Sequence, residues 1–157
     1  MDDTDLKILK MLRDNSRESL GVIAEKTGTS KATISRRITK LEDEGYISSY
    51  TLNTNLAKLG LMRAQVGIEV SGNLVDHVVD ELRSFKEIQT IYKVFGDHSL
   101  ICELYTKSVD SLYDIIQSKI LKISGIQNVE VDILIESIVM NPDAELDMLV
   151  NSMQERP

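Results

Sequence analysis

The sequence predicts an α+β protein, in which three short helices precede a unit that mixes strands and helices. Two observations carry this prediction. Apolar residues recur every three or four positions through residues 1–50, which is the helical period, and they alternate with polar residues from residue 64, which is the period of a strand. A length of 157 residues, 42% of them hydrophobic and 27% charged, suits one or two folded domains.

Each of the three expected helices has its own start and stop signals. Acidic or hydroxylic residues can cap the first turns, and glycine or short polar residues follow the apolar stripes. The expected caps are, in order, Asp2 or Asp3, Ser19, and Thr29 or Ser30, and the expected stops are Asn15-Ser16, Gly28 and Gly45. The inward stripes are Leu6, Leu9 and Leu12, then Leu20, Ile23 and Ala24, then Ile34, Ile38 and Leu41.

A domain over residues 1–50 has the layout of a winged helix-turn-helix, with the helix-turn-helix at about 21–40 and a strand at 46–52 as the wing. In such a domain the last helix enters the major groove of DNA, which is about 12 Å wide. The outward stripe of this helix is small, hydroxylic or basic, although any solvated helix face can carry basic residues. The expected DNA contacts are Lys31, Thr33, Ser35, Arg36, Arg37 and Lys40.

Arg37 lies on the flank of that helix, so two roles are open for it: a contact to phosphate, or a pair with an acid of the same domain. The net charge of −7 does not argue against DNA, because residues 1–50 are neutral overall and residues 51–157 carry the whole excess. Residues 28–41 contain four basic residues and no acid. Salt screens charges beyond about 10 Å, so the local patch decides.

Residues 63–140 follow the order β-α-β-β-α-β, which predicts a ferredoxin-like unit with a four-stranded antiparallel sheet and both helices on one face. Residues 51–62 form the linker before it. Residues 141–157 form a tail that is either a short helix or frayed. The expected strands are 64–71, 88–95, 99–106 and 128–140, with helices at 74–85 and 108–123.

Apolar residues are expected on the second face of this sheet as well. Ile91, Phe95, Leu134 and Ile138 share that face with polar residues. A second copy of the same sheet is the simplest cover for such a face. The sequence therefore predicts a homodimer or a higher homo-oligomer.

Composition excludes several other classes of protein. One Cys rules out a disulfide framework, and with only two His we expect no metal and no cofactor. No segment approaches the ~18 apolar residues of a membrane span, and the acidic start is unlike a signal peptide. We therefore expect a cytoplasmic protein with no membrane partner, in which Cys102 is a core residue and His77 an inert surface residue.

Three motifs stand in order in the first domain: Asp2-x-x-Asp5-x-x-Ile8-Leu9-x-x-Leu12, Arg17-x-Ser19-Leu20 with Ile23-Ala24, and Ser30-x-x-Thr33-Ile34-x-x-Arg37-Ile38-x-x-Leu41-Glu42-x-x-Gly45-Tyr46-Ile47. With these motifs the chain resembles the leucine-responsive/asparagine-regulator (Lrp/AsnC) family of transcription regulators. The resemblance covers about residues 1–140 and implies double-stranded DNA as the partner.

The resemblance also implies that the second domain dimerises and binds an effector, often an amino acid, near a Gly-Asp turn. Gly96 and Asp97 match that turn, and His98 and Ser99 complete the expected effector site. The family usually has Tyr or a similar group, then Asp, at these last two positions, and residues 125–129 lack its common Pro-Gly-Val. We therefore expect no response to a standard amino acid, or a response to an atypical ligand. His98 is alternatively a partly exposed turn residue.

The sequence leaves two other functions open. Siroheme decarboxylases resemble the same two-domain fold, but they need His and Arg groups around a tetrapyrrole, and the body of the second domain has only Arg63 and Arg83. A ligand-binding module without affinity for DNA is the third possibility. The recognition-helix pattern favours a regulator that is not an enzyme.

Overall fold

The computed structural model of the chain describes the backbone of residues 1–154 and the side chains of residues 1–149. The chain divides into two compact units. The helical unit contains residues 1–53 together with the segment from Val139 onward, and the sheet unit contains Thr54–Ile138. The α+β class expected from the sequence is confirmed.

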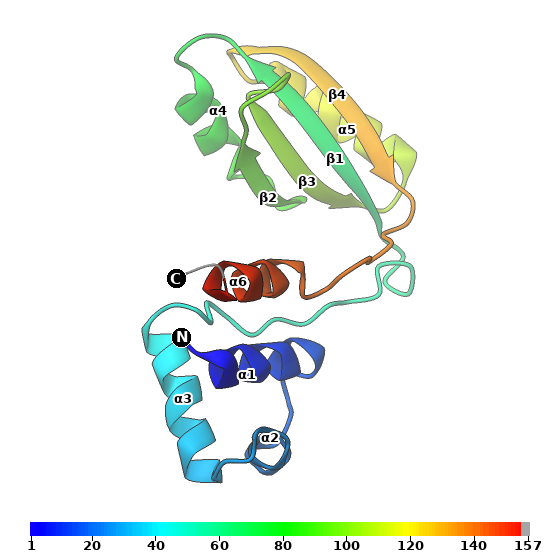
Figure 1. Cartoon of the computed structure of the whole chain (residues 1–157). Helices are drawn as coiled ribbons and strands as arrows, with labels where there is room; N and C mark the ends of the chain where they lie inside the picture. Colours follow the sequence, from blue (N-terminus) through cyan, green and yellow to red (C-terminus); the bar gives the residue numbers. More distant parts are fainter. Residues whose placement is uncertain (155–157) are drawn as a thin grey trace. The chain divides into compact units, whose positions relative to one another are not determined.

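Three helices build the core of the helical unit: α1 (Asp3–Asp14), α2 (Leu20–Thr27) and α3 (Lys31–Asp43) (Figure 1). The expected caps are confirmed, with Asp2, Ser19 and Ser30 each accepting a backbone N–H of the first turn. The inward stripes meet only in part, because Leu20 is exposed, and Ile8, which lies outside the stripe expected for the first helix, is fully buried. The core they form consists of Ile8, Ile23, Ala24, Ile34 and Leu41.

The wing strand expected at 46–52 is wrong. These residues form an irregular segment, and the described part of the helical unit contains no strand with which they could pair. The segment is instead held to the helices. Ile47 packs against the core and its N–H donates to the carbonyl of Leu41, and the Tyr50 hydroxyl donates to Glu42 at 2.8 Å.

The sheet unit has the predicted β-α-β-β-α-β order. Its sheet is antiparallel throughout, with strand order β2-β3-β1-β4. The elements are β1 (Met62–Val70), α4 (Val75–Leu82), β2 (Ile88–Lys93), β3 (Leu100–Thr106), α5 (Val109–Ser118), the short 3-10 helix η1 (Ile120–Lys122) and β4 (Ile126–Leu134). The helix expected through residue 123 thus ends at Ser118 and continues as η1.

One face of this sheet forms the core with α4 and α5. Alternate residues of β1 and β3 are buried there, among them Val66, Ile68 and Cys102. The placement of Ile91 on the second face is wrong, because Ile91 lies opposite Cys102 and packs into the core. The cause is a bulge in β2 between Ile88 and Thr90, which shifts the alternation of the strand by one residue.

The other expected residues of the second face have mixed outcomes. Leu134 lies opposite Arg63 on that face, as predicted. β4 ends there, because Arg63 is one residue from the start of β1 and no further partner is available. Ile138 therefore lies beyond β4, and the fully exposed Phe95 lies beyond β2.

The tail forms a helix, α6 (Ala144–Gln154), which belongs to the helical unit. Leu146 of this helix is buried, whereas Leu149 is exposed. The side chains of Val150 and Met153 lie outside the described residues.

Candidate nucleic-acid interface

The turn between α2 and α3 is set by a glycine and a serine. Gly28 closes α2 with φ +68°, a left-handed conformation that L side chains rarely adopt. The Ser30 hydroxyl then accepts the Thr33 N–H at 3.1 Å and starts α3. A Cβ on Gly21 would come within 3.1 Å of the flexible end of the Lys31 side chain, so the start of α3 lies close to the start of α2.

The two faces of α3 differ as the sequence predicts. Ile34 and Leu41 are buried and fix the helix to the core. The exposed side is small, hydroxylic or basic, which leaves the helix narrow enough for a major groove. The exposed residues of this side are Lys31, Ala32, Ser35, Arg36, Thr39 and Lys40.

Arg36 stands out within this exposed side. It is exposed and makes no hydrogen bond or ion pair with any residue that the structure describes. A guanidinium with all five donors free can pair with the two acceptors of a guanine edge. Lys40 is less available, because its ammonium group lies 3.7 Å from Glu44, and the Thr33 hydroxyl lies 2.9 Å from that of Ser30.

Arg37 has a different environment. Its guanidinium donates to Asp5 at 2.7 Å and to Asp2 at 2.8 Å, so it ties α3 to the start of α1. Asp2 and Asp5 also form a capping box. The N–H of Asp5, and then Arg37, hold the pKa of the Asp2 carboxyl below its usual value. Of the two roles left open for Arg37, the structure shows the pair with acids of the same domain.

Arg17 is a candidate that the sequence reasoning did not include. It is exposed and lies two residues before the cap of α2. The first helix of a helix-turn-helix crosses the DNA backbone, which is the signal that could have pointed to Arg17. It suits a phosphate contact better than a base contact.

The expected effector residues lie at the turn between β2 and β3. Gly96 and Asp97 are exposed. The Ser99 hydroxyl accepts the Val70 N–H at 3.1 Å, and the Ser99 N–H donates to the Ile68 carbonyl at 2.9 Å. Both groups of Ser99 are therefore already used to join the turn to β1.

His98 is used within the sheet unit as well. Its ring lies against Gly67, where a Cβ would come within 2.5 Å of Nε2, so only glycine leaves room for it. Nε2 lies 3.4 Å from a carboxylate oxygen of Glu130 on β4. The residues that replace the usual family pair thus contact the protein itself.

Other expectations concern single residues and absent groups. Cys102 is fully buried, and burial raises the pKa of its thiol to about 11, so it is a core residue as expected. His77 is exposed on α4. The described residues contain no cluster of three potential metal ligands, and no described helix has the length and apolarity to cross a membrane.

Two family models match the chain. A winged helix-turn-helix DNA-binding model matches residues 1–48, and an Lrp/AsnC ligand binding domain model matches residues 63–144. The transcriptional regulator LrpA of Pyrococcus horikoshii is 30% identical over 139 residues, covering 88% of this chain and 99% of LrpA. LrpA1 of Halobacterium salinarum is 32% identical over 126 residues, covering 80% of this chain and 89% of LrpA1.

Solved structures of similar proteins have the same fold as this chain. AsnC of E. coli superposes with a TM-score of 0.81 at 26% identity, over 90% of this chain and 96% of AsnC. A transcriptional regulator of Neisseria meningitidis in complex with L-Met has the same fold, with a TM-score of 0.82 at 19% identity over 89% of this chain and 93% of that one.

Both units therefore match in order and nearly in full length, and α3 presents the exposed side that a recognition helix requires. The resemblance expected from the sequence motifs is confirmed. This chain belongs to the Lrp/AsnC family and is a DNA-binding transcriptional regulator.

Proposed function

We propose that the chain binds a specific DNA sequence as a homodimer, with one α3 in the major groove of each half-site. The base-reading group is Arg36, supported by Lys31, Thr33, Ser35 and Lys40. The observation that carries this proposal is the exposed Arg36, which has no partner among the described residues, beside Arg37, which has two. Arg37 acts from inside the domain, by holding α3 against α1. Because the target is genomic DNA, the expected compartment is the cytoplasm.

The second face of the sheet supports the homodimer. Tyr92 and Leu134 lie on it as apolar groups, while Arg63 and Glu103 pair there at 3.3 Å. Tyr92 is 51% exposed in the single chain. A second copy of the sheet unit would cover this mixed face, and higher assemblies are compatible with it. Two recognition helices would then meet half-sites about one helical turn apart.

For the effector, we propose that the turn at Gly96 and Asp97 gives no response to a standard amino acid. The Neisseria relative is solved with L-Met, so the fold can hold an amino acid. In this chain, however, His98 and Ser99 already contact Glu130, Val70 and Gly67. A ligand would have to displace those contacts. Protein concentration and the spacing of operator sites would then set regulation.

An enzyme on the same fold is the second candidate, and the observations favour the regulator. The relatives LrpA and LrpA1 are transcriptional regulators by name. A siroheme-type reaction needs His and Arg groups gathered around a tetrapyrrole, whereas His77 is exposed on α4 and Arg63 is paired with Glu103. A tetrapyrrole absorption band in the purified protein would favour the enzyme instead.

The proposal is tested by selecting bound sequences from random DNA, followed by footprinting. We expect a palindromic site with two protected half-sites about one helical turn apart. A dimer at micromolar concentration by light scattering is expected in parallel. Recovery of random sequences with no shared motif, or a monomer in solution, would contradict the proposal.

A further inference from the structure

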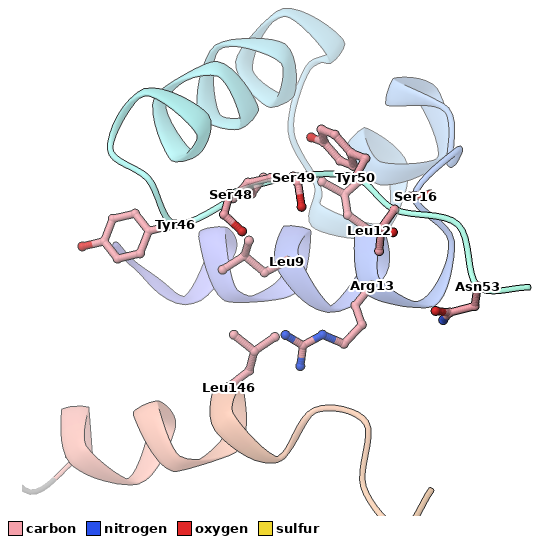
Figure 2. A pocket seen from close by; sticks show the side chains of 12 residues that line it. Leu9, Leu12, Arg13, Ser16, Tyr46, Ser48, Ser49, Tyr50, Asn53 and Leu146 are labelled. Atoms are coloured by element: carbon pink, nitrogen blue, oxygen red, sulfur yellow. The ribbon is translucent and has the colours of Figure 1, made fainter. Parts of the chain in front are cut away.

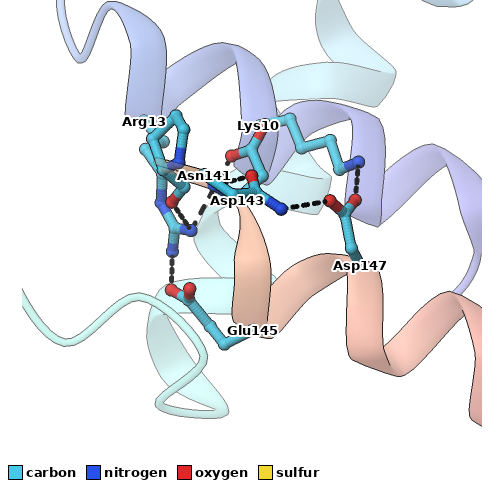
Figure 3. A network of polar contacts seen from close by, with 7 residues as sticks. Lys10, Arg13, Asn141, Asp143, Glu145 and Asp147 are labelled. Carbon is cyan, nitrogen blue, oxygen red and sulfur yellow. Dashed lines mark hydrogen bonds and ion pairs between the residues drawn. The ribbon is translucent and has the colours of Figure 1, made fainter. Parts of the chain in front are cut away.

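The C-terminal helix α6 lies beside α1 (Figure 1), and a set of charged contacts fastens it there (Figure 3). Lys10 pairs with Asp147 at 2.5 Å. Arg13 pairs with Glu145 and lies 3.7 Å from Asp143. Two cations of α1 thus meet three acids that follow one another at every second position of the tail.

The start of α6 is built around Arg13. The guanidinium donates to the carbonyl of Pro142 at 2.7 Å, one residue before Asp143. The side chain of Asn141 accepts the Asp143 N–H and donates to Asp147, both at 3.0 Å. These bonds fix the point at which the chain turns into α6, so the position of the helix on α1 is specific.

An apolar contact accompanies the charges. Leu146 is only 6% exposed, and its side chain points toward α1, whose Leu9 and Leu12 line the same pocket (Figure 2). These side chains, with Tyr46 and neighbouring residues, border a hollow of about 310 Å³ beside α1. Docking of α6 therefore removes an apolar side chain from water, in addition to forming ion pairs.

Because α6 contacts α1, the chain connects the helical unit and the sheet unit twice. The chain passes from the helical unit to the sheet unit after Asn53 and returns after Ile138. The outgoing segment is 54–61, and the returning segment, 135–140, contains no helix or strand. The Lrp/AsnC domain model ends at residue 144, where α6 begins, so nearly all of α6 lies beyond the part that defines the family.

We propose that α6 is a clamp that gives each helical unit a second tether to its sheet unit, and that this tether limits the half-site spacings a dimer accepts. The inference rests on the proposed function, because it requires two recognition helices on one DNA. With α6 docked, two chain segments restrict each helical unit. With α6 released, only residues 54–61 connect it, and it can reach a wider range of positions.

Docking of α6 is reversible because each contact that holds it to α1 is individually weak. Ion pairs at the surface contribute little each and are screened by salt. One buried leucine and a few such pairs can hold a short helix that is covalently attached, since the tether keeps its local concentration high. Raised salt is therefore expected to loosen the half-site spacing that the dimer tolerates.

The test compares Arg13→Glu, the charge exchange Arg13→Glu/Glu145→Arg, and the control Arg83→Glu in the full-length chain. The control makes the same charge change at an exposed site of the sheet unit. Hydrogen exchange of α6 should quicken about tenfold in Arg13→Glu, while α3 keeps its protection. The charge exchange should restore most of the protection, and the control should change neither helix.

Binding is then measured to the selected site and to a site with about five base pairs inserted between the half-sites, which rotates one by half a turn. The unmodified chain should lose about tenfold or more in affinity on the altered site, and Arg13→Glu about threefold or less. Unchanged exchange of α6 in Arg13→Glu would overturn the docking, and equal losses on the altered site would overturn the tether. Failure of the unmodified chain to bind its selected DNA would instead contradict the proposed function, because the exchange measurement needs no DNA.

Discussion

Truncation of Ile34 tests how α3 is held. Ile34 is fully buried at the centre of a small core that contains only four other buried residues. Replacement by Ala removes three carbon atoms and leaves a cavity, which costs about 2–5 kcal/mol, whereas Ile34→Val costs about 0.5–1.5 kcal/mol. In so small a core, few neighbours can move into the space, so we expect a value of at least about 2 kcal/mol for Ile34→Ala.

Hydrogen exchange is the suitable assay, because the two units have separate cores and can unfold separately. A loss of 2 kcal/mol quickens the exchange of α3 amides about thirtyfold through opening of the helical unit. Protection in β1 and β3 should stay unchanged. The matched control is Ile68→Ala, at a fully buried position of the sheet core, which should show the reverse pattern.

The reasoning would be refuted if Ile34→Ala left the α3 amides as protected as before. It would also be refuted if the two variants loosened both units equally. The first result would mean that the inward stripe does not hold the helix. The second would mean that the two cores fold as one.

Three further outcomes follow from charges and burial. Arg37→Ala should lower the thermal stability of the helical unit, because the nearly buried carboxylate of Asp5 loses its cation; equal melting of variant and unmodified chain would contradict this. Hydrogen bonds from α1 cations lower the pKa of Glu145 and of Asp147, so docking of α6 should persist at neutral pH and be lost as the pH falls below the ordinary carboxylate range and through these lowered values. Exchange of α6 that is independent of pH, after correction for the chemical rate, would argue against it. The thiol of Cys102 should resist alkylation at pH 8 until the sheet unit unfolds, and rapid labelling of the native protein would show that it is accessible.

Local signals made much of the fold predictable. The caps Asp2, Ser19 and Ser30 act within three residues of their own positions, so the sequence contains all that is needed to place them. Alternation likewise places Val66 and Ile68 in the core. The exposed side of α3 follows from the helical period alone.

Features that depend on distant partners were not predictable. The partners of Arg37 lie 32 and 35 residues away, and those of Arg13 about 130, so no local pattern indicates them. The bulge in β2 moves Ile91 to the core side, and one inserted residue leaves no mark in the apolar pattern. Residues 46–52 have the composition of a strand, but a strand also requires a partner.

Loss of Arg36 tests the central claim most directly. Binding of Arg36→Ala and of the control Arg83→Ala is measured on the selected site and on a site with one changed base pair in each half-site. Arg36→Ala should lose about 1–3 kcal/mol on the selected site and discriminate less between the two sites, with unchanged thermal stability, because Arg36 has no partner among the described residues. Arg83→Ala should behave as the unmodified chain. Binding of the selected site by Arg36→Ala as tightly as by the unmodified chain would contradict the assignment of α3 and Arg36 to sequence recognition.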